Sequence, residues 1–408
     1  MKKRTMLSAA ALLLAAIMCI SLTSCVSISA AELSEGYSRT AKDGGAESAE
    51  LYTAMADLAF RLLGKTLDPD GGNSLISPYS IAMCLGMLAE GADGETRTQL
   101  ETLLGMKSDA LSRALYAMNA RICGKDTPLS AADSVWVREG FPVKSDFLQR
   151  NADWYGADVF AAPFDEKTVN DINSWCAGNT DGMIKKMIDS IPAETVMYLI
   201  NAVCFDAEWE KKYEKRDVVD YLFYNRDGSE SSVKMLRSEN ETFLSSDTFR
   251  GFAKEYKGGA FSFVGLLPQQ RDADILDAAR RLDGETWLRL WSTRAGGAVA
   301  GVPEFRYDCS VSLADALKSL GVTDMFDEAS SDLGRLSDEH TYCSDVIHKT
   351  YIELDRNGTR AAALTGAIPN AMAMPAEDRT VILDRPFICM IVDNVSGMPV
   401  FIGVVTTL

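Results

Sequence analysis

The chain has 408 residues, with 41 Lys and Arg, 58 Asp and Glu and two His, which gives a formal net charge of −17. An acidic chain lacks the cationic face that nucleic-acid binders need, and two histidines exclude a His-rich metal site and leave little room for His-based catalysis. An apolar fraction of 47% and a mean hydropathy of −0.04 exclude a disordered, collagenous or multi-spanning membrane chain.

Residues 1–24 have the pattern of an export signal that is removed from the mature protein. Lys2, Lys3 and Arg4 precede an almost wholly apolar run from Met6 to Leu22. This run is slightly shorter than a typical membrane-spanning helix. A short apolar run behind a basic start is typical of a signal peptide.

The sequence Leu-Thr-Ser-Cys at positions 22–25 is similar to the lipobox of bacterial lipoproteins. This resemblance implies that Cys25 is lipidated and becomes the first mature residue; cleavage of a simple secretory signal nearby is the alternative. We expect an exported, extracellular protein held at the cell surface by its lipid, because an acidic domain is not attracted to anionic lipid by charge. Residues 25–47, rich in Ser, Ala, Gly and Glu, are expected to form a flexible tether.

Seven of the nine cysteines follow the lipobox. Their number is odd and no pair has Cys-x-x-Cys spacing, which argues against a disulfide framework or a zinc site. Cys84, Cys204 and Cys389 lie in apolar runs, as buried free thiols usually do. We therefore expect neither a metal nor a cofactor.

Helical patterns come mainly early in the chain. Apolar residues at positions 51, 55, 58 and 62 share one helix face. Ser77 and Pro78 supply an N-cap and a first-turn proline for a helix that runs through Leu88 and stops near Gly91. Further helices are predicted over residues 95–104, 145–155 and 168–179.

Strand patterns come mainly late. Strands are predicted over residues 196–205, 261–267, 299–307 and 350–355, and a buried hairpin over 387–392 and 400–405. Helices early and strands late favour a mixed α+β fold over a doubly wound one. Since no repeat or internal linker follows the tether, residues 48–408 are expected to form one domain.

An uncharged stretch of small residues precedes the hairpin. Residues 361–376 read AAALTGAIPNAMAMPA and contain no charged or aromatic residue, although 24% of the chain is charged. Gly366, Pro369 and Pro375 argue against a long buried helix, and flexible surface loops are usually polar. The third interpretation is a strand that has not yet formed. Its inward face would be small enough to slide between two existing strands, and comprises Thr359, Ala361, Ala363 and Thr365.

Eight motifs in register resemble the serpins, the serine-protease-inhibitor family. The likeness covers residues 48–408. The segment NSLISPYSI at 73–81 is similar to the family's Asn-x-x-x-Ser-Pro-x-Ser-Ile, and GTRAAA at 358–363 is similar to the hinge of its reactive loop. The other similar segments lie at 172–184, 199–209, 302–321, 348–349, 385–387 and 401–403.

This resemblance implies a serpin fold with three β-sheets, about eight or nine helices and an exposed reactive-centre loop at about 356–382. It also implies that the protein is not an enzyme but an inhibitor of serine endopeptidases. A protease attacks the loop and forms an acyl-enzyme, and the cut loop then inserts into the main sheet and traps the protease in a covalent 1:1 complex. The native fold would be metastable, held by a kinetic barrier, and monomeric.

The family's usual spacing from the hinge glycine implies that the reactive bond joins Met372 and Ala373. The loop is a few residues longer than is typical of the family, so Ala371 and Met374 remain alternatives. Such a bait suits elastase-like, subtilisin-like or chymotrypsin-like proteases; trypsin-like targets do not fit because residues 361–378 contain no Lys or Arg.

The resemblance also assigns conformational roles. The hinge would comprise Gly358, Thr359, Ala361, Ala362 and Ala363. Arg356 departs from the Glu that inhibitory members usually carry there, and a modest effect is expected of it. A polar gate beneath the sheet opening would comprise Ser77, Ser80, Asn201 and His348, because a paired polar network can hold one of two sheet states. Trp209 would lie at the breach, where the loop enters the sheet.

Three alternative functions remain. A serpin-fold carrier or binding protein would not inhibit, but the hinges of such members often carry bulky or charged residues on the inserting face. Some members inhibit cysteine proteases instead. A lipid-anchored enzyme is disfavoured because the sequence has no Gly-x-Ser-x-Gly, zinc or phosphate-loop signature.

Overall fold

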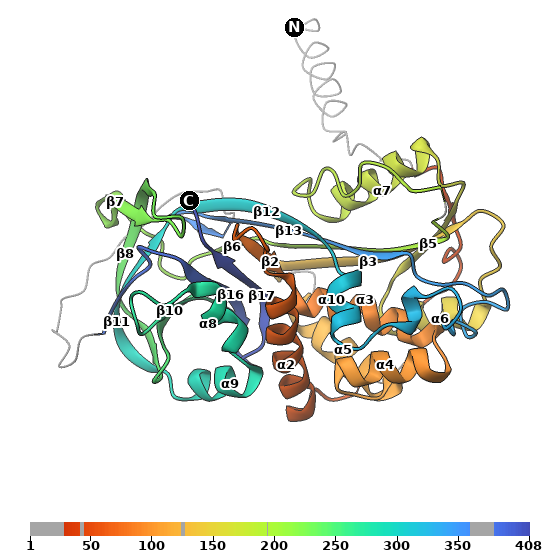
Figure 1. Ribbon diagram of the computed structural model, residues 1–408, viewed down its shortest axis with the longest axis horizontal. Helices are drawn as coiled ribbons and strands as arrows, with labels where there is room; N and C mark the ends of the chain where they lie inside the picture. Colours follow the sequence, from red (N-terminus) through yellow and green to blue (C-terminus); the bar gives the residue numbers. More distant parts are fainter. Residues whose placement is uncertain (1–27, 41–44, 124–126, 194, 360–378) are drawn as a thin grey trace, which may run out of the picture.

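The computed structural model describes residues 28–40, 45–123, 127–193, 195–359 and 379–408. In this part of the chain the elements form the mixed α+β fold that the sequence predicts, with nine α-helices and three sheets. Figure 1 shows an elongated molecule in which one long sheet crosses the body and a second, more curved sheet system closes one end.

The main sheet has the strand order β1-β4-β3-β5-β13-β14-β6, and β12 pairs with the other edge of β13. β3 and β5 are antiparallel, whereas β5 and β13 are parallel and pair directly. The strands span Ala31–Glu32 (β1), Asp158–Ala162 (β4), Leu129–Arg138 (β3), Met197–Phe205 (β5), Asp345–Leu354 (β13), Gly358–Thr359 (β14), Ala207–Glu208 (β6) and Phe305–Ser312 (β12).

The other two sheets share the long strand β8 (Glu230–Ser245). One of them adds β7, β11 and β15 to this strand, and the other runs from β8 through β9, β10, β16 and β17 to β2. Their bounds are Val218–Tyr224 (β7), Ala295–Pro303 (β11), Thr380–Ile382 (β15), Phe249–Glu255 (β9), Phe261–Pro268 (β10), Phe387–Asp393 (β16), Pro399–Val405 (β17) and Ser74–Ile76 (β2).

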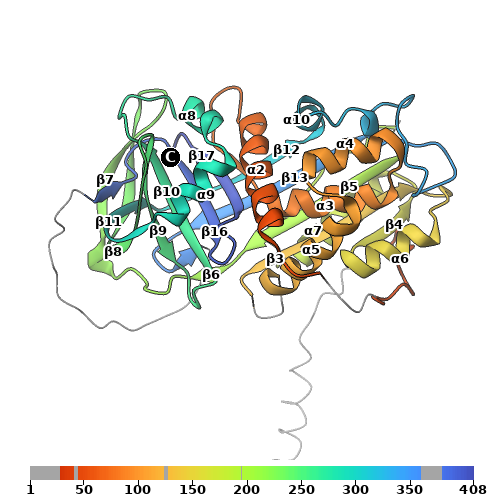
Figure 2. The same ribbon diagram turned by 90° about the horizontal axis from the view of Figure 1, so that it is seen from below.

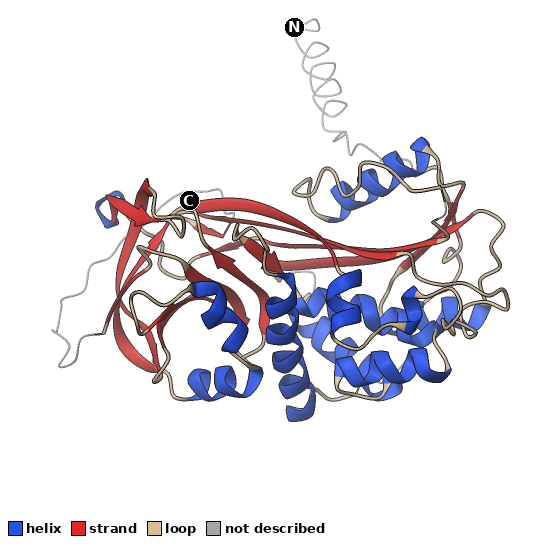
Figure 3. Cartoon of the chain, viewed as in Figure 1, coloured by secondary structure: helices blue, strands red, loops and turns tan. Residues whose placement is uncertain are grey.

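The helices cover the sheets unequally. Figures 1 and 3 show most of them gathered beneath the main sheet, with α7 alone on its other face, and Figure 2 shows α8 and α9 over β10, β16 and β17. The helices are Ala49–Thr66 (α2), Pro78–Gly91 (α3), Gly94–Leu104 (α4), Ser108–Ile122 (α5), Ser145–Trp154 (α6), Glu166–Asn179 (α7), Ile275–Arg281 (α8), Gly284–Ser292 (α9) and Ala314–Ser319 (α10); single 3₁₀ turns lie at Lys215–Asp217 (η1) and Asp324–Phe326 (η2).

Helix α3 sets the position of the main sheet over the core. Ser77 caps it by accepting a hydrogen bond from the Ser80 backbone N–H, and Pro78 occupies its first turn, as the sequence predicts. All its residues are buried, so the helix is apolar around its whole circumference rather than along one stripe. It packs against β5 and β17 and so joins the main sheet to the second sheet system.

The described part of the predicted tether is not free of the domain. β1 adds a short antiparallel strand to β4 at the edge of the main sheet, and the Leu33 N–H donates to the Val159 carbonyl at 2.7 Å. Ser29 Oγ and the Ala30 N–H both donate to Asp171 of α7. The composition of residues 25–47 predicted a flexible tether, because composition carries no information on contacts with residues as distant in the chain as Asp171. Within the described residues, no helix is both long and apolar enough to span a membrane.

Candidate functional site

The middle of the main sheet is closed by direct strand pairing. Tyr198–Ala202 of β5 lies in parallel register with Asp345–Lys349 of β13, and no described strand separates them. This pairing brings Asn201 of β5 opposite His348 of β13. Both side chains are buried on the face that packs on α3.

The four residues predicted to form a polar gate lie in one hydrogen-bonded network. The Ser77 N–H donates to His348 Nε2 at 2.9 Å, and His348 Nδ1 lies 3.0 Å from Asn201 Oδ1. Because Nε2 accepts, the neutral ring carries its hydrogen on Nδ1 and donates it to Asn201. Ser80 Oγ donates to the same Asn201 oxygen, and Asn201 Nδ2 donates to the Ser80 carbonyl at 3.1 Å. Their role as a gate stays a prediction.

Asp133 of β3 is a fifth member that the sequence reasoning missed. Asn201 Nδ2 donates to its carboxylate at 2.6 Å. Burial raises the pKa of Asp133 to about 7, although the hydrogen bond from Asn201 opposes the rise. Burial also lowers the pKa of His348 to about 3. The network therefore holds one acid and one base that both favour their neutral forms.

At the upper end of the main sheet, the first two hinge residues form a short strand within the sheet. β14 lies between β13 and β6, with Thr359 opposite Leu354 on one side and opposite Ala207 on the other. Gly358 fits only because it lacks a side chain, since a Cβ there would collide with the backbone carbonyl of Ala207. The first two hinge residues are thus already part of the sheet.

Thr359 points inward, as the predicted inserting face requires. Its side chain is 1% exposed, and its hydroxyl lies 2.5 Å from the Tyr256 hydroxyl. The Tyr256 ring stacks on Trp209 with centroids 4.5 Å apart and an interplanar angle of 8°. Burial raises the pKa of Tyr256, so this hydroxyl remains protonated and able to donate.

Trp209, predicted to lie at the breach, holds the chain that leads into the hinge. Its backbone N–H donates to the Asn357 carbonyl and its indole Nε1 donates to the Asp355 carbonyl, both at 2.9 Å. The Asp355 carboxylate accepts from the backbone N–H of Asn357 and Gly358, which fixes the turn. Arg356 is exposed at this turn, as the sequence predicts.

Other predicted site residues lie outside the described residues. They are Cys25, Ala361, Ala362, Ala363, Ala371, Met372, Ala373 and Met374. Beyond this gap, β15 begins at Thr380 and runs parallel to β11. Within the described ranges, no group of His, Cys, Asp or Glu is arranged to hold a metal ion.

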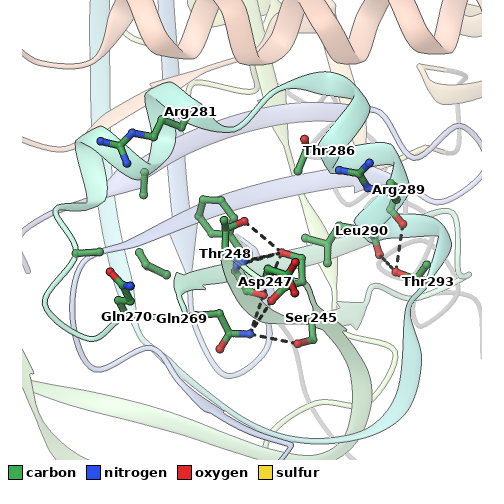
Figure 4. A pocket seen from close by; sticks show the side chains of 15 residues that line it. Ser245, Asp247, Thr248, Gln269, Gln270, Arg281, Thr286, Arg289, Leu290 and Thr293 are labelled. Carbon is green, nitrogen blue, oxygen red and sulfur yellow. Dashed lines mark hydrogen bonds between the residues drawn. The ribbon is translucent and has the colours of Figure 1, made fainter.

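A cavity of about 820 Å³ lies between α8, α9 and the turn that joins β8 to β9 (Figure 4). Figure 4 shows Arg281 and Arg289 along its rim and Gln269 bonded across the turn toward Ser245. None of the predicted site residues lines it. Its position therefore separates it from both the polar gate and the hinge.

Comparisons with known proteins agree with this geometry. The family model described as "Serpin (serine protease inhibitor)" matches residues 53–408. Glia-derived nexin of Rattus norvegicus is 30% identical over 81% of this chain and 86% of its own length, and leukocyte elastase inhibitor A of the same species is 29% identical over 81% and 92%.

Two solved states of one relative give a further comparison. The native state of tengpin, a thermophilic serpin, is 37% identical, covers 93% of this chain and all of its own, and superposes with a TM-score of 0.88. Its latent state covers 90% of this chain with a TM-score of 0.79. The described chain is thus more similar to the native state, in agreement with the direct pairing of β5 and β13.

Proposed function

The chain belongs to the serpin family, and on this premise we propose that it inhibits serine endopeptidases by suicide-substrate trapping. The observation that supports this proposal best is the contrast along the boundary between β5 and β13. Thr359 lies in the sheet at the upper end, between β13 and β6, while β5 and β13 below it pair directly with each other.

The register of the hinge defines which residues would insert. Thr359 lies opposite Leu354 in an antiparallel pair, so a continued strand would bring Ile368 opposite Asp345, the first residue of β13. Residues 360–368 would thereby fill the whole length of β13. Pro369 follows directly, where its missing N–H would cost no ladder hydrogen bond.

The same register is compatible with the polar gate. Thr365 would lie opposite His348, on the inward face that it shares with Thr359. A hydroxyl at this point could satisfy a buried ring nitrogen when Asn201 moves away with β5. Ala361 and Ala363 would fill the intervening inward positions with little volume.

The proposed reaction uses the protease's own nucleophile. Its serine oxygen bonds to the carbonyl carbon of Met372, the peptide bond to Ala373 breaks, and the new amine leaves with a proton. Strand insertion then competes with attack of water on the acyl ester. If insertion is faster, the protease is carried away from its leaving peptide and deacylation stops. Ala371 and Met374 remain the alternative bait residues.

Incubation of the mature domain with neutrophil-type elastase, chymotrypsin, subtilisin and trypsin tests the proposal. We expect a 1:1 adduct that survives SDS with at least one of the first three proteases and not with trypsin. Mass spectrometry of the released C-terminal peptide would show a start at Ala373. Cleavage by every protease without any adduct would make the protein a substrate and overturn the proposal.

We also propose that the protein is exported and anchored by lipid at Cys25. The argument rests on the basic start, the apolar run and the lipobox-like sequence. Cys25→Ser should release the protein from membranes in a bacterial host, while Cys123→Ser, a matched change in the domain, should not. Equal membrane association of the Cys25→Ser variant would contradict the anchor.

A further inference from the structure

Strand β7 exposes a cluster of large apolar side chains. Tyr221, Leu222 and Tyr224 are 39%, 44% and 41% exposed. Apart from Val395, they are the exposed large hydrophobic residues of the described chain. Single exposed apolar residues are ordinary, but these three line one shallow cavity together, and apolar patches on soluble proteins often bind partners.

The region around β7 contacts the chain segments that flank the reactive-centre loop on both sides. On one side, the Tyr213 N–H, which precedes β7, donates to the carbonyl of Arg356 at 3.1 Å. On the other side, the N–H of Tyr224, the last residue of β7, donates to the Asp384 carbonyl at 2.8 Å. Because both flanking segments contact this region, a protease that attacks the loop would be held at the end of the molecule where β7 lies (β7 is labelled in Figure 1).

The charged side chains around the patch are paired, and Asp384 is shared by Arg271 and Arg385. Lys234 pairs with Asp220 at 2.5 Å, and Arg271 lies 3.5 Å from Asp384 and 5.9 Å from the centre of the Tyr224 ring. A shallow cavity of about 550 Å³ opens between these groups and the apolar side chains. The surface thus offers aromatic and aliphatic area beside charges that already have partners, which suits an apolar partner surface.

We propose that Tyr221, Leu222 and Tyr224 form a second contact for the target protease, which docks its own apolar surface there while it attacks the loop. This inference rests on the proposed function, because it takes the protease as the partner. β7 is also the outer strand of its sheet among the described strands, so its free edge leaves room for a partner at the patch.

The test compares a patch variant with a matched control. Tyr221→Ser, Leu222→Ser and Tyr224→Ser are combined, and Val395→Ser, an exposed apolar residue in the turn between β16 and β17, serves as the control. The rate of loop cleavage and the rate of adduct formation are measured with whichever of elastase, chymotrypsin or subtilisin the wild type traps. We expect both rates to fall at least about 10-fold in the patch variant and to stay within about 2-fold in the control.

The partition between adduct and cleaved product should not change, since the patch acts before the acyl-enzyme forms. The fold reduction should be the same at low and high salt, because the patch is uncharged. Leu222→Ser alone removes no side-chain hydrogen bond and should reduce both rates by an intermediate factor. This single variant keeps the test valid if the triple variant does not fold.

Unchanged rates in the patch variant, with the adduct still formed, would overturn the second contact and leave the proposed function standing. Cleavage that slows in the patch variant without any adduct from the wild type would overturn the inhibitor and leave the contact standing. A slower rate that accompanies loss of a wild-type dimer in sedimentation would assign the patch to a second copy of the chain and overturn the proposal.

Discussion

The middle and the upper end of the main sheet differ in how the strands beside β13 are paired. In the middle, β5 and β13 pair directly above a buried network of Ser77, Ser80, Asn201, Asp133 and His348. At the upper end, β14 lies between β13 and β6, and Thr359 bonds to Tyr256, whose ring stacks on Trp209.

The difference shows how a sheet can be stable and still open. Backbone hydrogen bonds between β5 and β13 could be remade with an inserted strand, so their exchange has a small net cost. The buried polar side chains must find partners in both states, and this requirement gives the middle its resistance. At the upper end, Gly358 and Thr359 already pair with both neighbouring strands, which gives insertion a starting point.

The largest effect is expected from charge on the inserting face. Ala363→Arg would place a cation where the extended register points inward, and burying it without a partner would block insertion. Adduct formation should fall at least about 100-fold while cleavage continues. Ala362→Arg places the same charge on the outward face and should trap nearly as the wild type does. Adduct formation is measured on SDS gels. An equal loss of adduct in both variants would show that residues 362 and 363 do not point to opposite faces of an inserted strand.

A smaller but clear effect is expected from loss of the ring in the polar gate. His348→Ala removes the acceptor for the Ser77 N–H and the donor to Asn201. The buried Ser77 N–H loses its partner, Asn201 Oδ1 keeps only its bond from Ser80 Oγ, and a cavity is left, which together should lower the free energy of unfolding by about 2–4 kcal/mol. Urea unfolding followed by circular dichroism measures this change. A loss below about 0.5 kcal/mol would show that the network does not hold the sheet closed.

The pH dependence of stability should separate the two titrating members of the gate. The pKa of Asp133 rises from 3.8 to about 7, so its contribution is present below pH 4 and is lost as the pH rises through 7. The pKa of His348 falls from 6.5 to about 3, so its contribution is present above pH 6.5 and is lost as the pH falls through 3. Between pH 4 and 6.5 the two slopes oppose each other.

Asp133→Asn removes one of these slopes and keeps an acceptor for Asn201. The unfolding free energy of this variant, relative to wild type, should therefore increase from about pH 4 to pH 7 and stay level outside this range. Urea midpoints at intervals of one pH unit give the difference curve. A level difference across the whole range would show that Asp133 titrates normally in the folded protein.

The smallest effect is expected at the upper end. Tyr256→Phe removes the hydroxyl that bonds Thr359 and keeps the ring that stacks on Trp209. Loss of one neutral hydrogen bond should cost about 1 kcal/mol and make the hinge easier to expel. Amide exchange at Thr359 should accelerate several-fold while exchange at Asn201 stays constant. Equal acceleration at both sites would mean that the two regions open together.

Local signals were sufficient for some elements of the fold. Ser77 and Pro78 fixed the start of α3, and the two apolar runs near the C-terminus became β16 and β17 at nearly the predicted bounds. These segments are specified by caps and by continuous apolar runs, which neighbouring structure does not override.

Other features depended on distant partners. β1 exists because β4 offers an edge, and β14 has two residues, too few for any periodic pattern. Asp133 could have been found, because it shares a strand face with Val135 and Val137, and an acid on an apolar face signals a buried polar partner. The family motifs identified its partners but not Asp133 itself.

The thermal stability of the cleaved chain tests the central claim most directly. The loop would be cut within residues 361–376 by a protease that is not trapped, and the melting temperatures of intact and cut protein would be compared. If the cut segment inserts between β5 and β13, the melting temperature should rise by more than about 10 °C, since a full strand is added to the core. An unchanged or lower melting temperature would contradict the account, because the sheet would then have no place for the strand.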